Sequence, residues 1–340
     1  MSSVTLPQWF GDNDGSQPYR VISGKDDYIW WLEYLPDGRR AVTGSYSGTV
    51  RIWDLESGEE EGTSMEHESE ISGLAVTRDG TKIISSGCSG KITVWDVELH
   101  ERAREWTYPE AYCKIAISPD DRLVAVGDMS VGIHTMEGKL VSSIEVGDTI
   151  LAMCFSPDGH KLACGTRNAI RVYDVSNGAL LLGPLDRHWL SDVRWSRDGN
   201  RLFSGSEDKT IRCWDSDTGE QIGHPWTCHT NHMRTLSLSP DGSILASASL
   251  DRTIRFWNAT TGNPIRQPLQ HDKGVSAVCF SPSGEFVASA GGVRKIYLWR
   301  VPWLNLNTVS HQVIYSNIRV CPNTSTHRSL FAISATHNFA

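Results

Sequence analysis

The sequence lacks the features that define several large classes of protein. Its first residues, MSSVTLPQWFGDND, contain no basic stretch followed by an apolar one, as a secretory signal peptide would. No apolar run approaches the roughly 18 residues that span a bilayer. The net charge of −8 argues against broad attraction to nucleic acid or to anionic membranes. These absences predict an intracellular protein, cytoplasmic or nuclear, without membrane insertion or direct binding of nucleic acid.

The cysteines are not arranged as ligands or as a disulfide framework. None of the eight forms a CxxC pair, and none clusters with histidine in the spacing of a zinc site. We therefore expect no metal, no cofactor and a reducing compartment, with buried free thiols where cysteines fall in or beside apolar runs. The cysteines in such runs are Cys88, Cys113, Cys154, Cys164, Cys213 and Cys279.

Local catalytic motifs are also missing. The chain has no GxSxG elbow, no GxxxxGK[ST] phosphate loop, no HExxH and no GxGxxG. We therefore predict no catalytic residues and no small-molecule substrate. A set of Asp, His and Ser side chains assembled in space from distant segments stays open as an alternative.

What the chain does contain is an internal repeat. Seven related tetrapeptides occur along it, namely LPDG, TRDG, SPDD, SPDG, SRDG, SPDG and SPSG. Their third residues are Asp37, Asp79, Asp120, Asp158, Asp198, Asp241 and Ser283, separated by 42, 41, 38, 40, 43 and 42 residues. The mean step of 41 residues lies within the period of about 40–45 that is typical of propeller blades.

Each repeat reads as short strands joined by tight turns. An apolar run such as ILAMCF precedes the tetrapeptide, a second run such as KLACG follows it, and a third ends in an aromatic residue. This pattern predicts strand, turn, strand, with Pro and Asp-Gly supplying the turn. The closing aromatics are Trp53, Trp95, Tyr173, Trp214, Trp257 and Trp299, whereas the third repeat has His134 in this place.

These residues resemble the WD-repeat propellers, which include the G-protein beta subunit. The resemblance covers about residues 18–301 and implies an all-β, seven-bladed β-propeller of four-stranded antiparallel blades. In this family a repeat begins with the outer strand of the preceding blade. The segment PYRVIS, residues 18–23, is therefore expected to form the fourth strand of the last blade and close the ring. Residues 1–17 and 302–340 are predicted to be extensions, the second one mobile.

The resemblance also implies a hydrogen-bonded tetrad that joins the strands of each blade. Its members are a His before the blade, a Ser or Thr on the second strand, an Asp in the next turn and the closing Trp. The sixth repeat has all four, and the fifth has three, with His188 two residues out of register. The matching residues are His229, Ser247, Asp251 and Trp257 in the sixth and Ser204, Asp208 and Trp214 in the fifth.

The other repeats are incomplete at the tetrad positions. Ser47 and Ser89 replace the Asp in repeats one and two, Lys25 replaces the first His, and Val293 replaces the seventh Asp. We therefore expect blades one, three, four and seven to be less tightly joined.

Propellers of this family commonly bind partners on one face of the ring. The resemblance implies three contact positions in each repeat: nine and seven residues before the third residue of the tetrapeptide, and the residue before the tetrad Asp. The predicted partner-binding residues are Tyr28, Trp30, Tyr46, Met129, Trp189, His232, Arg234 and Leu250. Tyr, Trp and Arg are enriched at interface hot spots.

We therefore predict a non-catalytic scaffold or adaptor that binds other proteins, in a multi-protein complex. One alternative is a reader of peptides or histone tails, in which the aromatics cage a cation. Another is a hydrolase or isomerase that uses the central channel, which apolar inward positions such as Ile71, Ile150 and Val275 disfavour. The segment from Glu56 to Glu70, with seven glutamates and no Lys or Arg, is either a solvated loop and outer strand or a dock for a basic partner.

Overall fold

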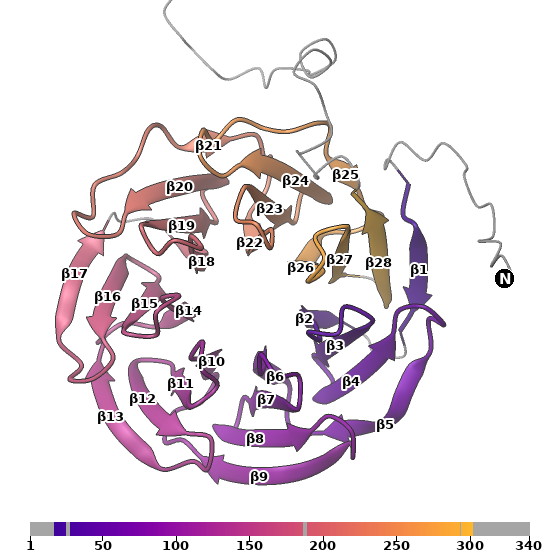
Figure 1. Cartoon of the computed structure of the whole chain (residues 1–340), viewed down its shortest axis with the longest axis horizontal. Helices are drawn as coiled ribbons and strands as arrows, with labels where there is room; N and C mark the ends of the chain where they lie inside the picture. The colour runs from indigo at the N-terminus through magenta and orange to yellow at the C-terminus, as the bar shows by residue number, and fades with distance from the viewer. Residues whose placement is uncertain (1–16, 25–27, 186–188, 293, 302–340) are drawn as a thin grey trace, which may run out of the picture.

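The protein is a closed ring of seven antiparallel sheets (Figure 1). The computed structural model describes residues 17–24, 28–185, 189–292 and 294–301. Each sheet has four strands and forms one blade, with its first strand at the centre of the ring. This arrangement confirms the seven-bladed all-β propeller that the repeat predicts.

The strands are short and follow the repeat closely. Blade one holds β2 (Ile29–Tyr34), β3 (Arg40–Ser45), β4 (Thr49–Asp54) and β5 (Glu60–Glu66). Blade two holds β6 (Ile71–Val76), β7 (Lys82–Gly87), β8 (Lys91–Asp96) and β9 (Glu101–Thr107). Blade three holds β10 (Lys114–Ile117), β11 (Leu123–Gly127), β12 (Ser130–Thr135) and β13 (Leu140–Glu145). Blade four holds β14 (Ile150–Phe155), β15 (Lys161–Thr166), β16 (Ile170–Asp174) and β17 (Leu180–Leu185).

The last three blades repeat this plan. Blade five holds β18 (Leu190–Trp195), β19 (Arg201–Ser206), β20 (Thr210–Asp215) and β21 (Trp226–Thr227). Blade six holds β22 (Met233–Leu238), β23 (Ile244–Ser249), β24 (Thr253–Asn258) and β25 (Leu269–Gln270). Blade seven takes β26 (Val275–Phe280), β27 (Phe286–Gly291) and β28 (Lys295–Arg300) from its own repeat, and β1 (Arg20–Ser23) as its outer strand.

The chain closes the ring with its first strand. β1 pairs antiparallel with β28, from Arg20 opposite Leu298 to Ser23 opposite Lys295. Ile22, on this strand, is only 2% exposed and packs into a cluster with Ile29 and Ile296. The strand therefore contributes both backbone pairing and core packing to the last blade, which confirms the predicted closure.

The tetrapeptide forms the turn between the first and second strands, as its residue types dictate. In blade six the Asp241 carboxylate accepts hydrogen bonds from Ser239 Oγ at 2.6 Å and from the backbone N of Ser243 at 3.0 Å. Gly242 follows with φ of 76°, a backbone region that side chains disfavour. Seven such turns put the chain in register for seven equal blades.

The core lies between neighbouring sheets. One cluster, for example, joins Val50 and Met65 of blade one to Ile71, Ile83 and Trp95 of blade two. Each such cluster joins neighbouring blades around the ring. The predicted extensions, apart from Gln17, lie outside the described residues, and among the described ones no helix is long and apolar enough to cross a membrane.

Candidate functional site

The predicted contact positions lie on one end of the ring, which we call the loop face. It consists of the loops that lead into each first strand and of the turns between second and third strands. In five blades a backbone hydrogen bond joins the two segments. The turn residue donates its N–H to the loop residue's carbonyl, at 2.9 to 3.0 Å. These pairs are Tyr46 with Tyr28, Cys88 with Glu70, Glu207 with Trp189, Leu250 with His232 and Gly292 with Gly274.

A β-bulge creates the remaining contact position. In six blades the first strand carries one residue without a partner in the ladder to the second strand, and that residue is seven before the third residue of the tetrapeptide. Bulges re-aim side chains and often mark functional surfaces. The bulged residues are Trp30, Ser72, Leu151, Ser191, Arg234 and Ser276.

The predicted partner-binding residues differ in their exposure to solvent. Tyr46 is 58% exposed, Trp189 61% and Met129 49%. His232 is also exposed, and its Nδ1 lies 3.5 Å from Glu207 Oε2. Leu250 is half-buried. The loop face therefore presents large apolar side chains to solvent around the ring.

Tyr28, Trp30 and Arg234 form a packed group instead of three separate side chains. The rings of Tyr28 and Trp30 have centroids 4.6 Å apart, and Ser276 Oγ donates to the hydroxyl of Tyr28 at 2.9 Å. The guanidinium carbon of Arg234 lies 5.5 Å from the centre of a Trp30 ring. These contacts connect blades one, six and seven at the loop face.

The tetrad residues of blade six form a continuous chain of hydrogen bonds. His229 Nδ1 lies 2.8 Å from Asp251 Oδ2, and His229 Nε2 lies 2.7 Å from Ser247 Oγ. Trp257 Nε1 donates to the same Ser247 Oγ at 2.9 Å. Burial lowers the pKa of His229. Burial alone would raise the pKa of Asp251, but hydrogen bonds from His229 and Thr253 outweigh it and hold that pKa well below its usual range.

Blade five brings together fewer of its predicted residues. Trp214 Nε1 donates to Ser204 Oγ at 3.0 Å. Asp208 accepts hydrogen bonds from Thr210 and pairs with Arg212 at 3.2 Å. His188 lies outside the described residues.

Blades two and seven have three tetrad members each, which the sequence analysis did not identify. His67 Nε2 lies 2.6 Å from Ser85 Oγ, which also accepts from Trp95 Nε1 at 2.7 Å. In blade seven the corresponding chain runs through His271, Ser289 and Trp299, at 3.0 and 2.8 Å. The sequence contained a signal for both, because His67 and His271 precede the third residue of their tetrapeptide by twelve residues, as His229 does. Blade seven, which we expected to be weakly joined, therefore retains most of the tetrad.

Blade three replaces the tetrad with a different network. Tyr108 stands in the His position, and its ring meets that of His134 edge-on at 5.8 Å. Its hydroxyl lies 3.0 Å from Ser130 Oγ. The Glu110 carboxylate accepts the backbone N–H groups of Asp128 and Met129, both at 2.9 Å, and that of Ser130 at 3.1 Å. Glu110 thereby holds the turn that exposes Met129.

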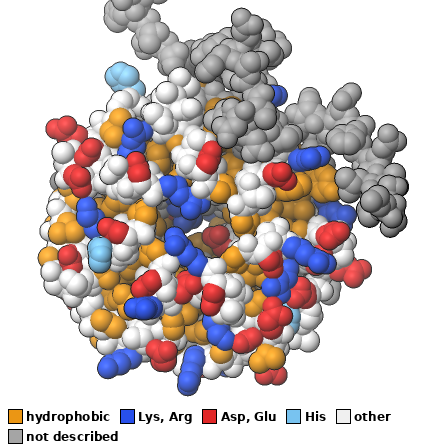
Figure 2. All heavy atoms as spheres, in the orientation of Figure 1, with side chains coloured by type: hydrophobic (Ala, Val, Ile, Leu, Met, Phe, Trp, Pro, Cys, Tyr) orange, Lys and Arg blue, Asp and Glu red, His pale blue; other side chains and the backbone are white. Residues whose placement is uncertain are grey.

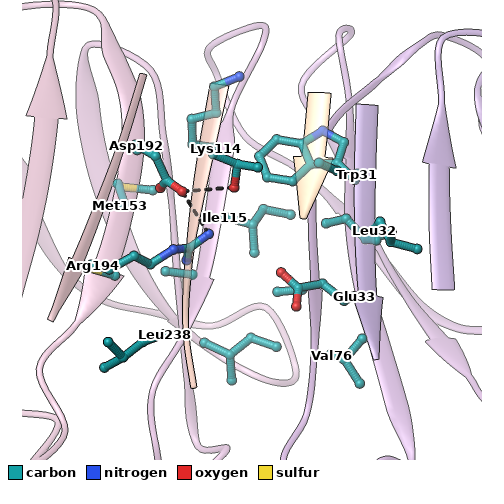
Figure 3. Close-up of a pocket in the computed structure, with 18 of the residues that line it drawn as sticks. Trp31, Leu32, Glu33, Val76, Lys114, Ile115, Met153, Asp192, Arg194 and Leu238 are labelled. Atoms are coloured by element: carbon teal, nitrogen blue, oxygen red, sulfur yellow. Dashed lines mark hydrogen bonds and ion pairs between the residues drawn. The ribbon is translucent and has the colours of Figure 1, made fainter. Parts of the chain in front are cut away.

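A channel of about 1060 Å³ runs through the middle of the ring. Figure 2 shows one of its openings as a central hollow with basic side chains beside it and an acidic one within. Figure 3 shows Lys114, Trp31 and Asp192 towards one end, and Glu33 and Arg194 farther along. Asp192 and Arg194 form an ion pair at 3.2 Å. Burial raises the pKa of Glu33, which Arg194 partly offsets.

The bulge changes which residues face this channel. Ile71, Ile150 and Val275 were predicted to point inwards, but each is at most 2% exposed and packs in a core cluster between blades. Of the three, only Ile71 also contributes to the channel lining. The prediction was wrong because the extra residue reverses the alternation of the strand, so that the charged positions of Figure 3 face inwards.

The acidic segment is partly neutralised within the chain. Its strand β5 is the outer edge of blade one. Glu60 pairs with Arg51, Glu61 with Arg40 at 3.1 Å, and Glu68 with Lys91 at 3.0 Å. These pairs favour the solvated outer strand over a dock for a basic partner.

Comparison with known proteins identifies the class of this ring. The family described as WD domain, G-beta repeat matches residues 16–54, 58–96, 138–174, 180–215, 220–258 and 262–300. These ranges cover more than half of the chain, which therefore belongs to that family. They omit residues 97–137, where blade three has its divergent network.

Among curated proteins, the chain is similar to small ribosomal subunit proteins of the RACK1 type. It is 30% identical over 112 residues to RACK1z and 32% over 111 residues to RACK1y, both of Oryza sativa subsp. japonica. It is 29% identical over 111 residues to RACK1 of Trypanosoma brucei brucei. Each match covers 29% of this chain and 33–35% of the relative, so the chain spans about a third of the length of these relatives.

Proposed function

We propose that this protein is a non-catalytic scaffold or adaptor inside the cell, which binds partner proteins of a multi-protein complex on its loop face. The observation that carries the proposal is the exposure of Tyr46 and Trp189, at 58% and 61%. Exposed large aromatics on the loops of a rigid ring are typical of interaction surfaces. The eight predicted residues Tyr28, Trp30, Tyr46, Met129, Trp189, His232, Arg234 and Leu250 are the proposed contacts.

The reader alternative is less well supported. A cage for a cationic side chain needs free aromatic faces. Arg234 already lies over Trp30, and Lys114 Nζ lies 5.7 Å from the centre of a Trp31 ring. The chain's own cations thus cover two of the tryptophans that line the channel, which favours the scaffold.

Affinity purification of the tagged full chain from its native cell tests the proposal. The Tyr46→Ala, Trp189→Ala double variant should lose partners that the wild type retains, and small ribosomal subunits are the first assembly to look for. The matched control is Leu99→Ala, Leu180→Ala, which removes side chains 67% and 50% exposed outside the loop face. Both variants should melt as the wild type does, because none of the four side chains is buried. Identical partner sets for all three proteins would refute the proposal.

A further inference from the structure

Two cations line the channel towards its loop face, and neither has a carboxylate partner among the described residues. Lys114 begins β10 in blade three, and Arg234 belongs to β22 in blade six. Lys114 Nζ donates to the carbonyl of Ser72 at 3.1 Å and lies over Trp31, while Arg234 lies over Trp30. We call these two cations and two indoles the basic mouth.

The two cations line the same channel, where their charges repel one another. Burial lowers the pKa of Lys114, and the charge of Arg234 lowers it further. Two positive charges held near each other at a partly desolvated site are costly unless an anion joins them. The basic mouth is therefore poised to gain free energy from an incoming negative group.

The part of the chain that the structure describes supplies no such group in direct contact with either cation. In the described residues neither Lys114 nor Arg234 has a carboxylate oxygen within 4.0 Å. By contrast, Arg194 is paired with Asp192 at 3.2 Å and Lys82 with Asp96 at 2.6 Å. Asp128 raises the pKa of Lys114 without forming an ion pair with it.

We propose that the basic mouth binds an acidic side chain of a partner peptide, with its carboxylate between Lys114 and Arg234. This proposal rests on the scaffold function and names the chemistry of the partner segment. The channel, of about 1060 Å³ including its mouth, leaves room for the inserted side chain.

Charge around the mouth selects a single acidic group over a polyanion. Glu70 and Glu207 also line the channel, and the whole chain carries a net charge of −8. Both repel an extended phosphate backbone, whereas one carboxylate can reach the two cations. The indole faces covered by cations likewise exclude a cationic ligand.

Fluorescence anisotropy with a labelled AAEAA peptide, which carries one glutamate, tests this site on the full chain at low salt. The wild type should bind it and should not bind the matched AAQAA peptide. The Lys114→Gln, Arg234→Gln variant should bind at least about tenfold more weakly, because it loses charge-assisted hydrogen bonds. The matched control is Arg78→Gln, Arg197→Gln, which removes the same charge from arginines within the tetrapeptide turns that line the channel and should keep wild-type affinity.

Three results would overturn the proposal: no binding by the wild type, equal losses in both variants, or displacement by inorganic phosphate well beyond that by acetate at equal ionic strength. The last would make the ligand a phosphate.

Repeating the affinity purification with Lys114→Gln, Arg234→Gln separates the two proposals. Partners lost on Tyr46→Ala, Trp189→Ala but kept on Lys114→Gln, Arg234→Gln would leave the scaffold standing and remove the basic mouth. Partners kept on Tyr46→Ala, Trp189→Ala but lost on Lys114→Gln, Arg234→Gln, together with binding of AAEAA by the wild type, would support the basic mouth and remove Tyr46 and Trp189 as contacts.

Discussion

His229 Nδ1 lies 2.8 Å from the carboxylate of Asp251, whereas His67 and His271 occupy the same place in blades two and seven without an aspartate opposite. In those blades Ser89 and Val293 stand in the aspartate's position. Burial lowers the pKa of His67 and of His271 to about 4. These two buried histidines therefore make the ring sensitive to mild acid.

The first prediction concerns His271 and pH. Its pKa falls from 6.5 to about 4 on folding, so between these values the unfolded chain binds a proton that the folded ring does not. The stability that neutral His271 allows is thus present above pH 6.5 and is lost as the pH falls towards 4. From pH 7 to pH 5 this residue should cost about 2 kcal/mol of the free energy of unfolding. Chemical denaturation at both pH values measures the loss, which His271→Gln should reduce. An unchanged pH dependence in the variant would contradict this assignment.

The second prediction compares the tetrad hydroxyl of Ser247 in blade six with that of Thr43 in blade one. Ser247→Ala should destabilise by roughly 2–4 kcal/mol, because it leaves both His229 Nε2 and Trp257 Nε1 buried without their partner. Thr43→Val should cost less, since Thr43 Oγ1 receives only the bond from Trp53 in blade one, at 2.9 Å. Denaturant titration of both variants gives the comparison. Equal losses of stability in the two variants would show that the hydrogen bond between His229 and Ser247 adds nothing to the stability of blade six.

A third prediction tests ring closure with two neighbours on β1. Ile22 is 2% exposed and Val21 is 41% exposed. Ile22→Ala should destabilise the ring by roughly 2–4 kcal/mol, and Val21→Ala by much less, because only the first leaves a cavity. Deleting residues 1–24 should lower the melting temperature further, since β28 then loses its whole pairing strand. A deleted chain that melts like the wild type would refute the closure.

The fourth prediction concerns the substitute network in blade three. Glu110→Gln keeps the size of the side chain but replaces one acceptor oxygen with a donor, while three backbone N–H groups still point at it. It should destabilise by roughly 1–3 kcal/mol and loosen the turn around Met129. Hydrogen exchange of residues 128–130 should rise in the variant, with the turn around Leu250 as an internal reference. Unchanged exchange at both turns would argue against this role of Glu110.

The sequence predicted the ring because the repeat is a local property that recurs seven times. A step of 41 residues with a turn motif and an aromatic at fixed offsets leaves few alternatives to a propeller, and PYRVIS followed from the same register. Each of these inferences needs only residues that are near one another in the chain.

The channel lining and the basic mouth could not be predicted from such local sequence patterns. Period-two alternation predicts Ile150 and Val275 on the inner surface, but one bulged residue shifts the phase and buries them. The stacking of Arg234 on Trp30 joins strands that are separated by most of the chain. No spacing in the sequence encodes such a contact, because it depends on how the blades are arranged round the ring.

The pairing of β1 with β28 also sets an order of events during synthesis. Strand β1 has no partner until residues 295–300 have been synthesised, because its ladder is with the last strand of the seventh repeat. Six blades can form while the chain is still growing, but the seventh cannot be completed until translation has passed its final strand. Until then the nascent chain carries an unpaired edge at each end, which makes this interval the one in which chaperones are most needed.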